Sequence, residues 1–238
     1  MSDTGTRDPL FGEAAHLAAS DTLSERAAAL VEHDILSGVW RPGERLAIQA
    51  LSARYAIGAT PLREALSRLV SRGLVSAVGQ KGFRVADVSQ ADLVDITLVR
   101  TMVEIEALRR SIENGGDAWE AGILAALHRL VRSVDRDPET MREGTPEFDL
   151  LHKAFHKALI DACGSRRLLQ LHDDLYYQAY RYRRAMMRRL DDHAAFVAAH
   201  QELAAIVIAR RGEEAETKLA RHLAQTLEIV YGGTEGQV

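Results

Sequence analysis

The chain has 238 residues, of which 47% are hydrophobic and 27% charged, and its 30 basic and 34 acidic side chains give a formal net charge of −4. This length allows one or two domains with a buried core, and the composition excludes wholesale disorder. The single cysteine, Cys163, excludes an intramolecular disulfide framework and fits a cytoplasmic protein. Because the sequence shows neither a signal peptide nor an apolar stretch of about 18 residues, we expect no membrane contact.

The charge is unevenly distributed along the chain. Residues 1–38 carry a net charge of −5, residues 39–86 a net charge of +6, and residues 87–238 a net charge of −5. A cluster of cations is more often a solvated surface than a binding site, so charge alone does not establish nucleic-acid binding. The basic segment favours such binding only if its fold gathers the cations on one surface.

The N-terminal part predicts a flexible arm over residues 1–20 and a small domain over residues 21–87. Apolar spacing and turn residues predict helices and strands in this order: helices over 24–36, 49–55 and from an N-cap at Thr60 to about Arg72, then strands over 74–78 and 83–85. In the third helix one face is apolar, formed by Leu62, Ala65, Leu66 and Leu69. Three helices followed by a hairpin predict a winged helix-turn-helix.

Residues 37–88 resemble the DNA-binding domain of GntR-type bacterial transcription regulators. The resemblance rests on the Pro-Gly turn at 42–43, the tight connection at 56–58 and the PLREAL sequence at 61–66. It implies that a set of residues on the recognition helix, the preceding segments and the wing contacts DNA: Arg45, Arg54, Thr60, Arg63, Arg68, Lys81 and Gly82. Gly58-Ala59 stands where the family often has Ser-Arg, so we expect a different half-site from that of the best-known relatives.

From Ser89 onward only helical periods occur, which predicts an all-α antiparallel bundle over residues 88–232 and a tail over 233–238. The expected helices run over residues 89–114, 118–135, 145–163, 165–190, 192–210 and 213–231.

Four histidines of this bundle indicate a possible site. His152 and His156 share one helix face, while His200 and His222 lie on two further helices. Spacing alone leaves a metal site and ordinary helical histidines as equal alternatives.

Three further segments, 152–171, 180–187 and 198–230, resemble the FCD effector domain of the FadR subgroup. This resemblance implies an effector-binding, dimerising bundle that binds a small carboxylate, frequently through a divalent metal held by an aspartate and three histidines. His156, His200 and His222 match the histidines, and His152 stands in place of the aspartate. Nitrogen ligands favour Zn²⁺ or Ni²⁺ over Mn²⁺ or Mg²⁺.

The same resemblance implies that Arg100 clamps the carboxylate, with Gln178 and Arg181 as weaker candidates for the pocket. The remaining histidines of the bundle, among them His172, are interpreted as surface residues, and Cys163 as a core residue.

The predicted function is a ligand-responsive transcription regulator that binds a near-palindromic double-stranded DNA operator as a homodimer. Repression is the default implied by the resemblance, with release by the carboxylate. Two alternatives remain open: a metal-dependent enzyme that uses the histidines, and a DNA-binding protein that senses nothing. Because no motif supplies a general base, we expect that the protein is not an enzyme.

Overall fold

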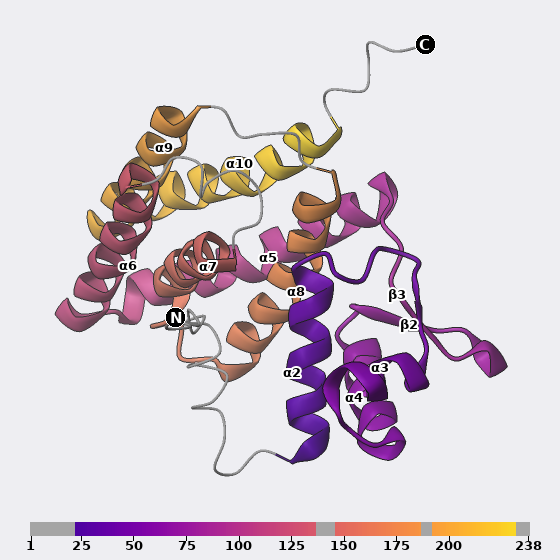
Figure 1. The fold of residues 1–238 in the computed structure, drawn as a ribbon. Helices are drawn as coiled ribbons and strands as arrows, with labels where there is room; N and C mark the ends of the chain where they lie inside the picture. Colours follow the sequence, from indigo (N-terminus) through magenta and orange to yellow (C-terminus); the bar gives the residue numbers. More distant parts are fainter. Residues whose placement is uncertain (1–21, 137–145, 187–191, 232–238) are drawn as a thin grey trace, which may run out of the picture.

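A computed structural model gives the fold of the chain and describes residues 22–136, 146–186 and 192–231. The predicted arm, the C-terminal tail and the helix end near Leu190 lie outside these residues. Within them, three helices and a small sheet are followed by six helices that form the larger part of the molecule (Figure 1). The predicted fold class, a winged helix-turn-helix followed by an all-α bundle, is confirmed.

The N-terminal unit consists of α2 (Leu23–Leu36), α3 (Ile48–Tyr55), α4 (Ala59–Ser71) and an antiparallel sheet of three strands in the order β1-β3-β2. The strands are β1 (Arg45–Leu46), β2 (Val75–Ala77) and β3 (Phe83–Val85), and a 3₁₀ turn, Gly79–Lys81, joins the last two. Helix α2 begins at a capping box, in which the Thr22 side chain accepts from the Glu25 amide and Glu25 accepts from the Thr22 amide.

Helix α4 is the helix that the resemblance assigns to DNA recognition, and its predicted apolar face is confirmed. Leu62, Ala65, Leu66 and Leu69 are fully buried. The predicted N-cap is wrong: Gly58 is the cap residue, and Thr60 lies inside the first turn. Pro61 is tolerated there because the amides of the first turn have no partner within the helix.

The bundle consists of α5 (Gln90–Asn114), α6 (Asp117–Arg136), α7 (Pro146–Ile160), α8 (Arg166–Met186), α9 (His193–Ile208) and α10 (Gly212–Tyr231). Helix α5 begins where predicted, since the Ser89 side chain accepts from the Asp92 amide. Cys163 lies in the main bundle core, as predicted. None of the helices in the described part of the chain combines the length and hydropathy needed to span a bilayer.

A buried aspartate ties α2 to α3 and to the loop between them. Asp34 on α2 accepts from Arg54 Nε at 2.5 Å and from the Tyr55 hydroxyl at 2.7 Å, and that hydroxyl accepts from Trp40 Nε1 at 3.1 Å. We expect Asp34→Ala to lower the free energy of unfolding by about 1–3 kcal/mol, because these donors lose their acceptor. Urea denaturation measures this. Glu64→Ala, at an exposed position of α4, is the control, and an equal effect of both changes would contradict the assignment.

Candidate functional site

Four imidazole rings from three helices meet at one point inside the bundle. His152 and His156 come from α7, His200 from α9 and His222 from α10. Nε2 of His152 lies 3.1 Å from Nε2 of His200 and 3.2 Å from Nε2 of His156. Nε2 of His156 lies in turn 3.2 Å from Nε2 of His222. One potential ligand atom from each ring falls within 4.8 Å of all the others. The structure therefore brings together all four of the predicted metal ligands.

The spacing of these nitrogens suits a small divalent metal. Two nitrogens that each lie about 2.0–2.1 Å from a tetrahedral Zn²⁺ are about 3.3–3.4 Å apart, close to the spacings above. The lone pairs of these Nε2 nitrogens must also be available for coordination. Nδ1 of His200 donates to the Phe196 carbonyl at 2.7 Å, which leaves Nε2 unprotonated in the neutral ring. Nδ1 of His152 lies 2.9 Å from the Tyr176 hydroxyl on α8. Such outer partners orient metal-binding imidazoles.

The surroundings favour neutral imidazoles. Rings of Phe148, Phe155 and Phe196 pack against the histidines. Burial lowers the pKa of His156 to about 4, although the nearby carboxylate of Glu104 opposes this shift. Burial, together with the neighbouring histidines, also lowers the pKa of His222 well below its ordinary value. Both rings are therefore neutral at pH 7 and able to coordinate a cation.

A buried ion pair lies behind the histidines and was not predicted as such. Glu104 Oε1 accepts from Arg100 Nε at 2.5 Å and lies 3.1 Å from Nδ1 of His172, while Oε2 lies 3.8 Å from Nδ1 of His156. Burial disfavours the Glu104 carboxylate, but Arg100 and His172 outweigh this and hold its pKa well below the usual range. The interpretation of His172 as a surface residue is wrong, since its side chain is fully buried.

Two polar atoms in this region offer hydrogen bonds to a further molecule. Arg100 Nη2 and His172 Nε2 are buried, and neither has a hydrogen-bond partner among the described residues. A buried polar atom without a partner costs about 1–3 kcal/mol, so a ligand that hydrogen-bonds to these two atoms would remove this cost. The guanidinium of Arg100 also lies over the Tyr176 ring, 5.0 Å from its centre. The structure thus places Arg100 close to the histidine cluster, with one nitrogen available for an anion.

The other two residues predicted for the pocket lie elsewhere. Gln178 Nε2 donates to the Arg72 carbonyl at 2.8 Å, and Arg181 Nη1 donates to the Ala86 carbonyl at 2.8 Å. Both acceptors belong to the N-terminal unit. The structure therefore brings Gln178 and Arg181 to the contact between the two parts of the chain and not to the histidines.

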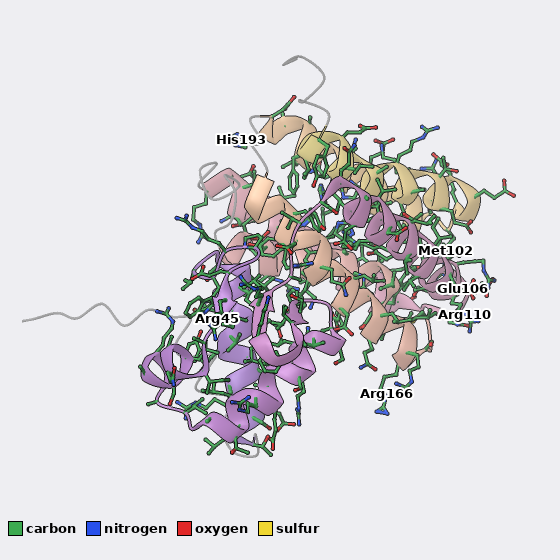
Figure 2. All side chains as sticks on the ribbon, turned by 90° about the vertical axis from the view of Figure 1, so that its right-hand side faces the viewer. Arg45, Met102, Glu106, Arg110, Arg166 and His193 are labelled. Atoms are coloured by element: carbon green, nitrogen blue, oxygen red, sulfur yellow. The ribbon has the colours of Figure 1, made fainter. Side chains whose placement is uncertain are left out.

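The predicted DNA-contacting residues differ in their surroundings. Arg45, Thr60, Arg63 and Lys81 are exposed, and Gly82 at the wing has a positive φ of 87°, a conformation that favours glycine. Figure 2 shows Arg45 on the unit that holds the recognition helix.

Two arginines of the predicted set are held by acidic partners of α2. Arg54 is 46% exposed and pairs with Asp34, while Arg68 pairs with Glu25 at 3.3 Å. Arg63 is exposed in the first turns of α4, which leaves its guanidinium accessible to DNA.

Comparisons with known proteins match two separate segments of the chain. Residues 23–85 match the model of bacterial regulatory proteins of the gntR family, and residues 95–225 match the FCD domain. The HTH-type transcriptional repressor GlaR of Escherichia coli K12 is 39% identical over 215 residues, which are 87% of this chain and 94% of GlaR. The uncharacterized HTH-type transcriptional regulator BphR of Paraburkholderia xenovorans is 36% identical over 83% of this chain and 80% of its own.

Solved structures support the same fold. E. coli McbR/YncC superimposes with a TM-score of 0.74 at 22% identity, over 90% of this chain and 99% of its own. A GntR regulator from Rhodococcus sp. RHA1 gives a TM-score of 0.70 at 21% identity. GlaR is named a transcriptional repressor, which favours a transcription regulator over the alternative of a metal-dependent enzyme. Because the FCD match alone spans more than half of the sequence, the chain belongs to the GntR family of bacterial regulatory proteins and carries an FCD domain.

Proposed function

We propose that this transcription regulator is a homodimeric repressor of the FadR subgroup that binds a near-palindromic operator in the cytoplasm and is released by a small carboxylate. The observation that carries the proposal is the convergence of four imidazoles beside a buried arginine, in the same chain as an exposed recognition helix. Repression is supported by the similarity to GlaR, which is named a transcriptional repressor.

The residues of the histidine cluster suit a divalent metal, with Zn²⁺ or Ni²⁺ favoured by four nitrogen ligands. When bound, the metal would supply a Lewis-acidic cation that attracts a carboxylate oxygen. The four imidazoles carry no negative charge, so they leave the charge of the cation unneutralised. Glu104 does not change this balance, because Arg100 already compensates its carboxylate. The site as a whole therefore favours an anionic ligand.

Arg100 gives the carboxylate its orientation. Its Nε is held by Glu104, so the position of the guanidinium is fixed before a ligand arrives. A second nitrogen of the guanidinium, Nη2, can then donate to a carboxylate oxygen, and His172 Nε2 offers a second position for a polar ligand group. We therefore expect effectors that are small organic acids, including dicarboxylates, hydroxy acids and sugar acids.

A thermal-shift screen of zinc-loaded protein tests this ligand class, because a ligand that binds the folded state raises the apparent stability. We expect at least one acid to raise the melting temperature of the wild type and to have no effect on Arg100→Ala. Failure of all three acid classes to stabilise the wild type would contradict the proposed effector and favour a DNA-binding protein that senses nothing.

An operator is obtained by selecting duplexes from a random pool with the full-length protein. We expect the selected duplexes to share two related half-sites about one helical turn apart, as a two-fold symmetric dimer requires. Selected duplexes with a single half-site would contradict the dimeric arrangement, and failure to enrich any sequence would contradict operator recognition itself.

The homodimer is supported by an apolar strip along α5. Val94, Leu98, Val99 and Met102 are 44–66% exposed on this helix. Figure 2 shows Met102, Glu106 and Arg110 along the outer edge of the bundle, so that charged residues border the strip. An apolar centre with a polar rim is typical of a protein–protein interface, and self-complementary pairing of two α5 helices gives two-fold symmetry.

We expect Leu98→Glu to weaken dimerisation by about 30-fold or more, because the pairing would bury a charge at the centre of the strip. Sedimentation equilibrium gives the dissociation constant. Leu124→Glu is the matched control, since Leu124 is 54% exposed on α6 and lies outside the strip. A Leu98→Glu protein that dimerises as tightly as the control would exclude α5 as the interface.

A further inference from the structure

Helix α8 contacts the histidine site and the DNA-binding unit with opposite faces. On one face, His172 lies against Glu104, and the Tyr176 hydroxyl lies against His152. On the other face, one helical half-turn away, Asp174, Tyr177 and Gln178 contact the N-terminal unit. In Figure 1, α8 lies alongside α2, at the side of the bundle next to the N-terminal unit.

The contacts on the second face converge on Arg72, the residue that ends the recognition helix α4. Arg72 Nε donates to Asp174 Oδ1 of α8 at 2.7 Å, while its Nη2 donates to Glu32 of α2 at 3.2 Å. The Arg72 carbonyl accepts from Gln178 at 2.8 Å. The guanidinium also lies 5.4 Å from the centre of the Tyr177 ring. Both the side chain and the main chain of Arg72 are thus held by α8.

The pair is partly protected from water, with 28% of the Arg72 side chain and 25% of the Asp174 side chain exposed. The next residue, Gly73, has a φ of +70°, and a Cβ at this position would lie 2.8 Å from Gln178 Nε2. The chain therefore turns sharply at the end of α4, directly against α8. A small displacement of α8 along its axis would separate Asp174 and Gln178 from Arg72.

We propose that Arg72 is a positioning residue for DNA binding, through which α8 sets the orientation of the recognition helix according to the state of the histidine site. This inference rests on the proposed function, because it assumes that the histidine site is filled by a metal. Two links join the site to α8: His152 contacts Tyr176, and His156 lies beside Glu104, which contacts His172. Occupation of the site fixes these rings and thereby the position of α8.

Docked and undocked arrangements of Arg72 on α8 provide the two states that such coupling requires. When the histidines are fixed, the contacts of His172 and Tyr176 favour the docked state of α8, and Arg72 transmits this state to α4. The two acidic partners of Arg72 allow this role to be distinguished from a role within the N-terminal unit alone. Glu32 belongs to the same unit as Arg72, whereas Asp174 belongs to the bundle.

Hydrogen–deuterium exchange of the full-length protein, stripped of metal and then loaded with Zn²⁺ alone, tests the proposal. In the wild type we expect Zn²⁺ to slow exchange both in the helices that carry the histidines and in α4 with the following strand, by about fivefold or more. In Asp174→Asn the slowing should persist in the bundle but be lost in α4. In Glu32→Gln, the matched control, the slowing of exchange should persist both in the bundle and in α4.

Four other exchange patterns would contradict the proposal or the function on which it rests. Equal slowing of α4 in Asp174→Asn and the wild type would overturn the role of Arg72. So would equal losses in the two variants, because Arg72 would then act only within its own unit. Slowing confined to the bundle of the wild type would overturn the coupling and leave the metal site intact. No effect of Zn²⁺ on any helix would instead contradict the proposed function.

Discussion

Replacing both His156 and His200 with alanine is expected to remove bound Zn²⁺ and to abolish the stabilisation that Zn²⁺ gives the wild type. The two rings supply two of four converging nitrogens, and they belong to different helices. Because changes to outer partners of a metal ligand already cost about 10–100-fold in affinity, loss of two ligands should cost more than 100-fold. Isothermal titration with Zn²⁺ measures the affinity, and elemental analysis of protein purified without a histidine tag gives the metal content.

The matched control for this change is His128→Ala, since His128 is an exposed histidine on α6. It should bind Zn²⁺ as the wild type does. His156→Gln with His200→Phe keeps more of the buried volume and separates loss of metal from loss of packing. Equal metal contents of the wild type and the double variant would show that the four rings are not a metal site.

Arg63→Ala is expected to lower the affinity for the selected operator by about 10–100-fold, corresponding to about 1–3 kcal/mol for an arginine that reads a base edge bidentately. Arg63 is exposed in the first turns of α4, and its neighbour Leu62 faces the core, so the change leaves the packing intact. Fluorescence anisotropy with the operator duplex measures the affinity.

Arg166→Ala removes the same charge at an exposed position of the bundle, at the start of α8, where Figure 2 labels Arg166. It should bind the operator as the wild type does. Equal affinities of the two variants would show that Arg63 makes no specific contact, whereas a loss in Arg63→Ala that is independent of operator sequence would assign it to the phosphate backbone.

Much of the fold follows from periodicity and capping. The apolar face of α4 and the start of α5 at Ser89 are readable because helical spacing and a serine cap are local properties. Strand β1, Arg45–Leu46, escapes such a reading because two residues are too few to show alternation. The N-cap of α4 was misplaced because Gly58 caps through its backbone conformation without a side-chain bond, whereas Thr60 has the side chain expected of a cap.

The candidate site, too, is only partly predictable from local sequence patterns. Spacing puts His152 and His156 on one face, but only the resemblance to FCD domains connects them with His200 and His222. Glu104 was missed because an arginine and a glutamate four residues apart on a helix usually form an exposed pair. Its burial is a consequence of how α5 packs against α7 and α8, which no local pattern reveals.

The position of the arginine-rich segment on α8 depends on helix packing as well. Arg181 and Gln178 lie on the face of α8 opposite His172, so the same helix that contributes to the histidine site turns these two residues towards the N-terminal unit. A resemblance of sequence identifies the helix, but the direction of each side chain follows from the domain contact.

An acid bound at the histidine site is expected, above all, to change the affinity of the protein for DNA. The direct measurement is an anisotropy titration of the selected operator with zinc-loaded protein, in the presence and absence of the acid that gives the largest thermal shift. We predict a weakening of operator binding between about fivefold and 150-fold, the range of typical coupling between two sites. Identical operator affinities at saturating acid would contradict the account.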